Sequence, residues 1–403
     1  MIQIAILGFG VVGGGTAEVL TKNRDLLAKT LGQPLTIKKI LDLRDFPQSP
    51  FGSLVTHDIN DILNDDDISI VVEAMGGLHP AYDFTKAALT AGKSVVTSNK
   101  QVVAACGAEL LALAKEKGVR YLFEASVGGG IPVIGPLGHD LAANRIRRID
   151  GILNGTTNYI LTRMFSSGVD FAAALAEAQQ KGFAEADPTA DVEGYDAARK
   201  IVILAALAFG KLLSPEKIFC RGVTGVTADD MQTAEAFGYV LKLICHAEKI
   251  GERVLAAVEP RFVPATHQLA HIEGVFNGIL IEGDMVGDVL LYGQGAGKLP
   301  TASAVAGDVI EAAVHPAPLP APLPFAAAAD ADYADAEAIP SPFCFSFAAA
   351  DADRDKIEDV LGDCRMLTLQ GRVACISGPM TRRDAEKAAA VVGLPLLSLY
   401  PLL

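Results

Sequence analysis

The sequence from Ile2 to Gly13, IQIAILGFGVVG, joins an apolar run rich in β-branched residues to a glycine-rich turn. The glycines stand at the G-x-G-x-x-G spacing, and a helical pattern follows to about Leu27. This arrangement of a strand, a glycine-rich turn and the first turn of a helix is typical of a dinucleotide site. It directs backbone N–H groups and the helix N-terminus toward a pyrophosphate. The stretch therefore predicts a dinucleotide site. We expect it to be lined by Gly8, Phe9, Gly10, Val12 and Gly13.

Strands and helices continue to alternate through the first third of the chain. This alternation favours an α/β fold with a doubly wound parallel sheet of Rossmann type. Ligands of such sheets bind beyond the carboxyl ends of the strands, so Gly76, Ser98, Asn99 and Lys100 are expected to face the cofactor crevice. The predicted strands after the first are 35–41, 67–74, 95–100 and 121–124, and a helix is predicted over 107–117.

The second predicted strand ends in Asp42-Leu43-Arg44, where the adenosine ribose of a dinucleotide is expected. A carboxylate at this point accepts hydrogen bonds from a free ribose 2′-hydroxyl, whereas an arginine pairs with a 2′-phosphate. Asp42 lies nearly 30 residues past Gly13, later than the usual ~20. This position favours Arg44 and NADP(H), with NAD as the alternative.

The composition excludes several classes of protein. At 403 residues, with 50% hydrophobic and 20% charged residues, the chain is typical of a globular protein of two or three domains. A net charge of −14 repels phosphate backbones, so we expect no nucleic-acid partner. The sequence shows no apolar run of about 18 residues, and its six cysteines form no zinc-type cluster. We therefore expect a cytoplasmic protein with reduced thiols and no membrane partner.

The sequence predicts a dinucleotide-binding domain over residues 1–130 and an α+β substrate and dimerisation domain over 131–314, from which a helix at 303–314 returns to the first domain. Residues 315–340 are nearly all Ala, Pro and Asp and predict a semi-rigid linker. Residues 341–403 have the order βαββαβ, which predicts a ferredoxin-like module. Within the second domain we expect strands at 148–153, 253–263, 274–282 and 289–292, and helices from Tyr159, over 171–181 and over Ala228–Lys249.

Ionisable residues are concentrated from Gly182 to Lys200, GFAEADPTADVEGYDAARK, just before the apolar run IVILAALAFG. Asp196 and Lys200 lie four residues apart, so a helix places them on one face. Such a pair is commonly a surface ion pair worth roughly 0.3–0.5 kcal/mol. Here the apolar run places Lys200 where water is scarce, and a partly desolvated lysine beside a carboxylate can act as a general acid. Glu185 adds a further carboxylate on the preceding loop.

A glycine-rich turn follows Glu124, in the sequence EASVGGGIP. Three consecutive glycines favour a hinge, because glycine frees the backbone to bend sharply. One carboxylate with several carbonyl groups on such a turn could instead hold a hard cation through oxygen ligands.

Six motifs in this sequence resemble the homoserine dehydrogenase family, over most of residues 1 to about 315. The resemblance implies reversible hydride transfer between NAD(P)H and L-aspartate 4-semialdehyde, which gives L-homoserine on the way to threonine, isoleucine and methionine. The motifs are GFGVVGGG near the start, TSNK at 97–100, EASVGGGIP from 124, GILNGTTNYIL from 151, GFAEADPTADVEGYDAARK from 182 and YGQGAGKLPTASAV from 292.

The same resemblance implies roles for individual residues. Lys200 would donate a proton to the carbonyl oxygen as hydride arrives, Asp196 would assist it, and Lys100 would lie at the interface of cofactor and substrate. The implied substrate-binding residues are Glu185, Asp196, Lys200, Thr156 and Tyr159, and Gly297 joins the cofactor site. A sodium ion is implied at the Glu124 loop, in place of the hinge, with Glu124, Val127, Gly129 and Ile131 as ligands.

The resemblance also implies a homodimer or a dimer of dimers, and an ACT-like C-terminal module. The ligand turn of that module departs from the family pattern, because residues 350–355 read ADADRD without glycine. Two alternatives remain. One is a catalytically silent NADP(H)-binding regulator of the same fold, which loss of Lys200, Asp196 or Glu185 would favour, although all three are present. The other is a dehydrogenase for another small amino-acid aldehyde.

Overall fold

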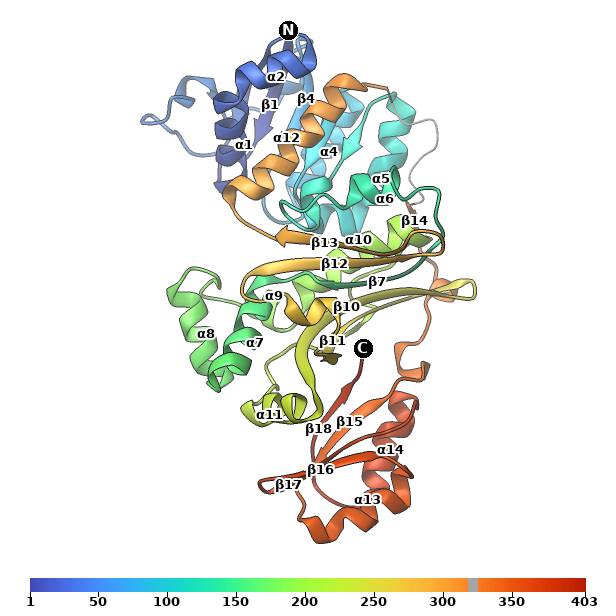
Figure 1. Cartoon of the computed structure of the whole chain (residues 1–403). Coiled ribbons are helices and arrows are strands. Elements are labelled where there is room, and N and C mark those ends of the chain that lie inside the picture. The colour runs from blue at the N-terminus through green and yellow to red at the C-terminus, as the bar shows by residue number, and fades with distance from the viewer. Residues whose placement is uncertain (318–324) are drawn as a thin grey trace. The chain divides into compact units, whose positions relative to one another are not determined.

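The computed structural model describes residues 1–317 and 325–403. The chain divides into two compact units, each assembled from segments that are distant in sequence (Figure 1). The first unit contains Met1–Arg147, Val202–Glu216 and Glu282–Asp330, and the second contains Arg148–Ile201, Lys217–Ile281 and Ala331–Leu403. Among the described residues, no helix is both long and apolar enough to cross a membrane.

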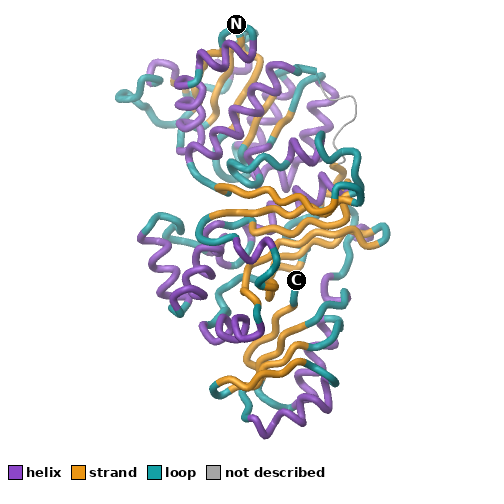
Figure 2. The backbone as a smooth tube through the Cα atoms, in the orientation of Figure 1, coloured by secondary structure: helices purple, strands orange, loops and turns teal. Residues whose placement is uncertain are grey.

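A six-stranded parallel sheet forms the centre of the first unit, which confirms the predicted Rossmann-type fold (Figure 2). Its strand order is β3-β2-β1-β4-β5-β6. The order reverses between β1 and β4, so the switch point at which such sheets bind ligands lies beyond the ends of these two strands. The strands are β1 (Ile2–Leu7), β2 (Leu35–Leu41), β3 (Val55–Thr56), β4 (Ile68–Glu73), β5 (Ser94–Thr97) and β6 (Tyr121–Leu122).

The helices of this unit include one that comes from far along the chain. The helix α12 (Lys298–Val314) lies beside α1 (Val11–Lys22) in Figure 1, and its Val305 and Val309 share a buried core with Ile4 and Val72. Residues near 300 therefore complete the hydrophobic core of the N-terminal sheet. The other helices are α2 (Arg24–Leu31), α3 (Asn60–Leu63), α4 (Ala81–Thr90), α5 (Lys100–Lys117) and α6 (Ile134–Gly138).

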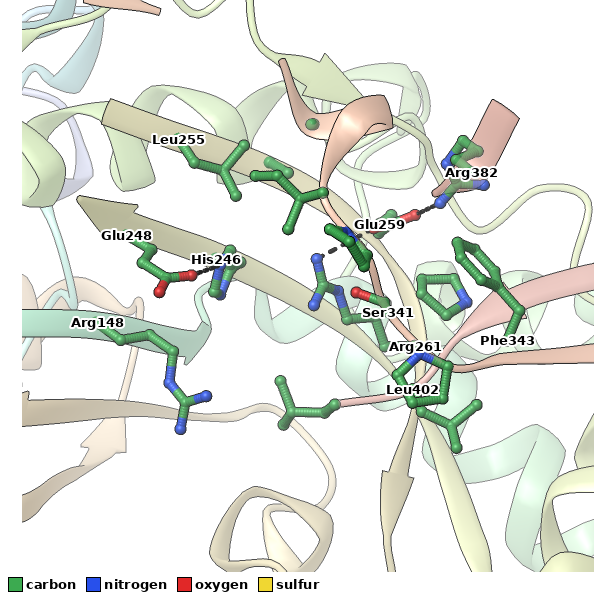
Figure 3. Close-up of a pocket in the computed structure, with 17 residues that line it drawn as sticks. Arg148, His246, Glu248, Leu255, Glu259, Arg261, Ser341, Phe343, Arg382 and Leu402 are labelled. Carbon is green, nitrogen blue, oxygen red and sulfur yellow. Dashed lines mark hydrogen bonds and ion pairs between the residues drawn. The ribbon is translucent and has the colours of Figure 1, made fainter. Parts of the chain in front are cut away.

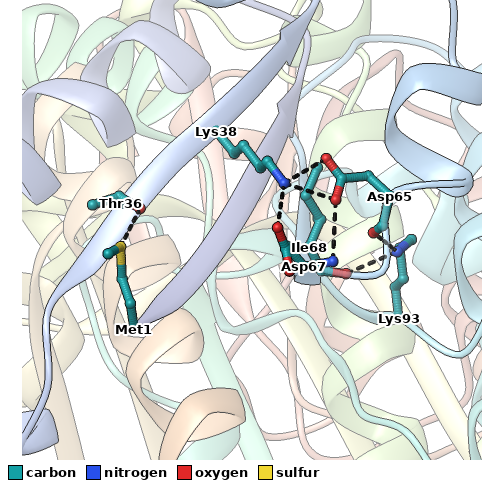
Figure 4. Close-up of polar contacts among 7 residues, drawn as sticks. All are labelled: Met1, Thr36, Lys38, Asp65, Asp67, Ile68 and Lys93. Carbon is teal, nitrogen blue, oxygen red and sulfur yellow. Dashed lines mark hydrogen bonds and ion pairs between the residues drawn. The ribbon is translucent and has the colours of Figure 1, made fainter.

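Lysine side chains fix the start of β4 (Figure 4). The Nζ atom of Lys38, on β2, lies 2.8 Å from carboxylate oxygens of both Asp65 and Asp67. Lys93 donates from Nζ to the main-chain oxygens of Asp65 and Ile68, at 2.7 and 2.8 Å. These contacts hold the amino-terminal end of β4, so they act at the end opposite to the one where ligands bind.

Part of the predicted linker is docked on the first unit. The strand β14 (Phe325–Ala327) pairs in parallel with β8 (Gly210–Leu212). Phe325 is buried, and its ring centroid lies 5.6 Å from that of Phe123. The same ring lies against Gly107, where a Cβ atom would approach it to 2.7 Å. Residues 318–324 of the predicted linker lie outside the described residues.

A second six-stranded sheet has the order β13-β12-β7-β10-β11-β9. The strand β10 is antiparallel to both β7 and β11, whereas β9 is parallel to β11, which confirms the predicted mixed sheet. Its strands are β7 (Ile146–Ile152), β9 (Phe219–Cys220), β10 (Tyr239–Ile250), β11 (Arg253–Pro264), β12 (Phe276–Gly283) and β13 (Gly287–Gln294). The accompanying helices are α7 (Gly155–Ser167), α8 (Phe171–Gln180), α9 (Thr189–Val192), α10 (Tyr195–Phe209) and α11 (Ala228–Phe237).

The helix predicted over Ala228–Lys249 is wrong beyond Phe237. Thr227 begins α11 with a capping box, and Gly238 ends it with a left-handed φ of 81°. The next 12 residues form β10, which pairs with β11 along its whole length. Seven consecutive residues from Leu241 are buried, and a strand buried on both faces shows no alternation by which a sequence could distinguish it from a helix.

The C-terminal module has the predicted ferredoxin-like order βαββαβ. Its antiparallel strands are arranged as β16-β17-β15-β18. The module contacts β11 within the second unit, where the rings of Phe262 and Tyr400 stack with centroids 5.6 Å apart. Its elements are β15 (Phe343–Phe347), α13 (Arg354–Leu361), β16 (Arg365–Leu369), β17 (Arg372–Ile376), α14 (Arg382–Val392) and β18 (Leu396–Pro401).

Candidate active site

The glycine turn after β1 requires glycine at two positions. Gly8 has a φ of 89°, in the left-handed region that glycine adopts without strain. At Gly13 a Cβ atom would lie 1.9 Å from the main-chain oxygen of Gly8. Gly10 precedes α1 as its N-cap residue and carries no side chain that would block the helix N-terminus. The predicted residues Phe9 and Val12 flank these glycines, so the turn leaves a main-chain surface suited to a phosphate group.

An acid and an arginine meet at the end of β2. Asp42 accepts hydrogen bonds from the amide of Phe9, at 2.7 Å, and from Nε of Arg44, at 2.9 Å. The Arg44 hydrogen bond lowers the pKa of Asp42 to about 2. His57, which the sequence argument missed, has Nδ1 2.7 Å from the main-chain oxygen of Asp42. The acid therefore contacts the glycine turn, while the Arg44 side chain is 63% exposed.

Glu73, which was not predicted, and Asn99, which was predicted to face the cofactor crevice, connect the loops after β4 and β5. Glu73, fully buried, accepts hydrogen bonds from Thr97 Oγ1 at 2.5 Å and from the amide of Met75 at 2.7 Å. Burial raises the pKa of its carboxyl group. Asn99 caps α5 and donates to the main-chain oxygen of Gly77 at 2.8 Å. The predicted residues Gly76, Ser98 and Lys100 lie on the loops that these contacts hold together, and Lys100 is the first residue of α5.

The expected ion pair forms in the second unit, on α10. Lys200 Nζ lies 2.7 Å from Asp196 Oδ2, and both side chains are only 9% exposed. The same Nζ donates to the main-chain oxygen of Leu153 at 2.7 Å. Asn154, the next residue, donates from Nδ2 to Asp196 Oδ2 at 3.0 Å and to Asp191 Oδ1 at 2.7 Å. Asn154 and Asp191 were not predicted as site residues, although both lie within motifs that resemble the family.

The three remaining predicted substrate residues lie around α7 and α8. Thr156 Oγ1 donates to the main-chain oxygen of Phe183 at 2.7 Å. The Tyr159 hydroxyl donates to Glu177 at 2.7 Å and accepts from Lys181 at 2.9 Å. Glu185 is exposed, on a loop whose main chain accepts a hydrogen bond from Gln179. Thr156 and Tyr159 therefore hold α7 against the loop and α8, and the described contacts do not connect them directly to Lys200.

The Glu124 loop belongs to the first unit. The carboxylate of Glu124 accepts hydrogen bonds from the amides of Val133, Ile134 and Gly135, at 2.6, 2.9 and 2.7 Å. Within the described residues, no group of three or more His, Cys, Asp or Glu side chains could hold a metal ion. Any cation at this loop would therefore depend on main-chain oxygens.

A cavity of about 220 Å³ in the second unit contains none of the predicted site residues (Figure 3). Its charged side chains are largely paired with one another. Glu259 bridges Arg261, at 3.1 Å, and Arg382, while His246 lies 2.7 Å from Asp150. The cavity also contacts Leu402, near the end of the C-terminal module. The Glu259–Arg382 pair joins β11 to α14 and so holds this module on β11, whereas the other two pairs lie within the sheet.

A glycine turn at a Rossmann switch point, together with a buried amine beside a carboxylate, defines a dehydrogenase that uses a nicotinamide cofactor. The sequence matches the family model described as homoserine dehydrogenase over residues 132–310, and that of the homoserine dehydrogenase NAD-binding domain over residues 8–124. The chain belongs to the homoserine dehydrogenase family.

Individual relatives agree with this assignment. The chain is 46% identical over 315 residues to the homoserine dehydrogenase of Synechocystis sp., covering 77% of this chain and 72% of the relative. With that of Corynebacterium glutamicum it shares 43% identity over 319 residues, at the same coverage. These matches support an NAD(P)-dependent oxidoreductase acting on a CH–OH group, and they do not support the catalytically silent regulator.

Solved structures extend the similarity to the whole chain. The homoserine dehydrogenase of Thiobacillus denitrificans is 34% identical with a TM-score of 0.91, covering 100% of this chain and 98% of that one. A hyperthermophilic archaeal homoserine dehydrogenase in complex with NADPH is 30% identical with a TM-score of 0.66, covering 77% of this chain and 97% of that one.

Proposed function

We propose that this protein interconverts L-homoserine and L-aspartate 4-semialdehyde in threonine, isoleucine and methionine biosynthesis, with NADP(H) as the hydride carrier and NAD as the alternative. The observation that carries the proposal is the buried Lys200–Asp196 pair, with 2.7 Å between Nζ and Oδ2, in a chain of this family. When bound, the nicotinamide supplies hydride to the aldehyde carbon or accepts it from the alcohol.

Lys200 manages the proton in this reaction. Hydride addition turns the aldehyde oxygen into an alkoxide, which the Lys200 ammonium group stabilises and then protonates. In the oxidation, the neutral amine accepts the proton of the hydroxyl group. Asp196 Oδ2 and the Leu153 oxygen each take one N–H of the ammonium group, which leaves its third N–H for the substrate oxygen.

The first unit would hold the cofactor. The N-terminus of α1 and the turn from Gly8 to Gly13 fit the pyrophosphate, since a side chain at Gly13 would collide with Gly8. Arg44 would leave Asp42 and pair with a 2′-phosphate, whereas in NAD the Asp42 carboxylate would accept hydrogen bonds from the free ribose hydroxyls. The other proposed contacts are Gly76, Ser98, Lys100 and Gly297.

Substrate recognition requires groups for an amino-acid backbone as well as for the reacting carbon. We assign Glu185 to the substrate ammonium group, because its carboxylate is exposed and makes no hydrogen bond or ion pair with the described residues. Thr156 and Tyr159 would form the wall that carries this loop, and Lys100 would lie where cofactor and substrate meet. These roles extend the similarity to the family residue by residue.

The Glu124 loop fits a sodium ion through its main chain. The Glu124 carboxylate already accepts three amide hydrogen bonds, so the carbonyl oxygens of Glu124, Val127, Gly129 and Ile131 would be the ligands. In the described part of the chain, no hydrogen-bond donor contacts the carbonyl oxygens of Val127, Gly129 or Ile131. Such free oxygens are the groups that a hard cation prefers.

Assembly and location complete the proposal. We expect a homodimer or a dimer of dimers in the cytoplasm, in agreement with six free cysteines. The C-terminal module has the strand order expected of an ACT-like domain, but its turn at 350–355 contains no glycine. The module is therefore proposed as ACT-like in fold, without an assigned amino-acid ligand.

Oxidation of L-homoserine at alkaline pH, followed at the nicotinamide absorbance with NADP and NAD in parallel, tests the proposal. Turnover with L-homoserine, faster with NADP, is the expected result. Turnover with another amino alcohol but none with L-homoserine would contradict the assignment of L-homoserine as the substrate. If the protein binds the cofactor but oxidises no amino alcohol, the proposal that it is an active dehydrogenase is wrong.

A further inference from the structure

We infer that Asn154 is a positioning residue: its carboxamide bridges Asp191 and Asp196 and fixes the Asp196 carboxylate on Lys200. The inference rests on the proposed function and deepens it, because it says what holds the general acid in place. Asn154 is 5% exposed and lies at the N-cap of α7, next to Leu153, whose oxygen accepts from Lys200.

The hydrogen bonds of Asn154 determine which way its amide points. Oδ1 accepts from the amide of Thr157 at 2.9 Å, which caps α7. Nδ2 donates to Asp191 Oδ1 at 2.7 Å and to Asp196 Oδ2 at 3.0 Å, so both of its N–H groups are used. A flipped amide would set NH2 against an N–H and oxygen against two carboxylates. The observed orientation is therefore the one that every partner requires.

The electrostatic consequence concerns Lys200. Asp196 and the buried thiol of Cys245, on β10, lie next to Lys200, and the two N–H groups of Asn154 add the positive end of a dipole between Asp191 and Asp196. Asp196 Oδ2 receives one hydrogen bond from Asn154 while it pairs with Lys200 Nζ at 2.7 Å. Replacing the amide donors by a carboxylate would add negative charge near Lys200 and favour its charged form.

Helix capping alone does not require asparagine. Aspartate and serine cap helices about as well as asparagine, because each places an oxygen near the free amides of the first turn. Only the amide offers two donors to the acids while its oxygen caps the helix. Asn154→Asp therefore keeps the cap and the side-chain shape, but it sets a carboxylate oxygen against Asp191 and Asp196 in place of two N–H donors.

The test measures Lys200 directly and by turnover. Full-length wild type, Asn154→Asp and Asn154→Ser are labelled with acetic anhydride from pH 6 to 11, and acetylation of Lys200 is quantified by peptide mass spectrometry. For Asn154→Asp we expect the labelling midpoint to rise by roughly one pH unit. The pH at which L-homoserine oxidation sets in should rise equally, and kcat/KM at pH 8 should fall about tenfold. NADPH affinity, measured by fluorescence, should not change.

Asp170→Asn is the matched control, since Asp170 caps α8 through the amide of Ala173 at 2.8 Å and does not contact the Lys200 cluster. Its labelling and pH profile should match wild type. An unmoved Lys200 midpoint in folded Asn154→Asp would overturn the inference. If that variant does not fold, Asn154→Ser, which keeps the cap with at most one donor, decides in the same way. A shifted midpoint in a protein that does not oxidise L-homoserine would overturn only the proposed function.

Discussion

The glycine turn of the first unit and the Lys200 cluster of the second are built in opposite ways. At the turn the main chain makes the site, and Gly13 is required because a Cβ atom would lie 1.9 Å from the Gly8 oxygen. In the cluster, side chains make most of the contacts: Asn154 and Asp196 lie 42 residues apart, and Lys200 reaches the main-chain oxygen of Leu153, 47 residues before it. Substitutions at the turn should therefore act through shape, whereas those in the cluster should act through charge and proton transfer.

The largest effect is expected for Lys200→Met. The variant removes the proposed proton donor, so kcat for L-homoserine should fall roughly 10³-fold, while NADPH still binds. The buried Asp196 carboxylate would lose its contact with the Lys200 ammonium group, so stability should fall by about 3 kcal/mol. Stopped-flow or steady-state kinetics and denaturant unfolding measure the two effects.

Lys22→Met is the control for Lys200→Met, because Lys22 forms the same i, i+4 pair with Glu18, at 2.6 Å, but is 71% exposed. Burial is then the main difference between the two pairs. Lys22→Met should change neither kcat nor stability by a measurable amount. Near-normal kcat in Lys200→Met would contradict the role of Lys200 and remove the contrast between the two regions.

The same contrast explains how much the sequence alone could predict. The strand, turn and helix at residues 2–22 follow from local spacing, and the Asp196–Lys200 contact follows from helix geometry. Asn154 and Glu73 were missed because their partners lie far along the chain, so only the folded structure brings them together. The error over β10 has a related cause, since its pairing with β11 decides its conformation and no local pattern records that pairing.

Gly13→Ala tests the main-chain site. The added methyl group would force the turn away from α1, so NADPH affinity should fall roughly 100-fold. Gly14→Ala is the matched control, because a Cβ atom there meets nothing within 4 Å and alanine favours the helix. Isothermal titration with NADPH measures both variants. Equal affinity in the two would contradict the assignment of the turn to the pyrophosphate.

A smaller effect is expected at Arg44, the exposed partner of Asp42. Arg44→Leu removes a charge-assisted contact to a 2′-phosphate, so the ratio of kcat/KM for NADP to that for NAD should fall about tenfold. Asp42→Asn should move the ratio in the opposite direction, because it weakens the acceptor for a free ribose hydroxyl. An unchanged ratio in Arg44→Leu would place cofactor discrimination on other residues.

The smallest effect is expected for Lys242, a buried lysine of the second unit. Its hydrogen-bond acceptors are uncharged, whereas Lys200 is paired with the carboxylate of Asp196. Lys242 Nζ donates to the Ile272 main-chain oxygen at 2.5 Å and to Asn158 Oδ1 at 3.2 Å, both of them uncharged acceptors. Burial lowers the pKa of Lys242 from 10.5 to about 8. Between these two values the folded protein binds fewer protons at this site than the unfolded chain. The contribution of Lys242 to the free energy of unfolding must therefore rise from pH 8 to pH 10.5.

Lys242→Met should remove this rise and leave the rest of the pH dependence in place. Guanidinium unfolding at intervals across that window measures it as the difference between the wild-type and variant curves. Lys249→Met, on the same strand but 45% exposed, should retain the wild-type slope. Parallel curves for wild type and Lys242→Met would mean that Lys242 keeps its charge when buried. Uncharged acceptors would then be enough to keep a buried lysine charged, and the contrast between Lys242 and the carboxylate-paired Lys200 would be lost.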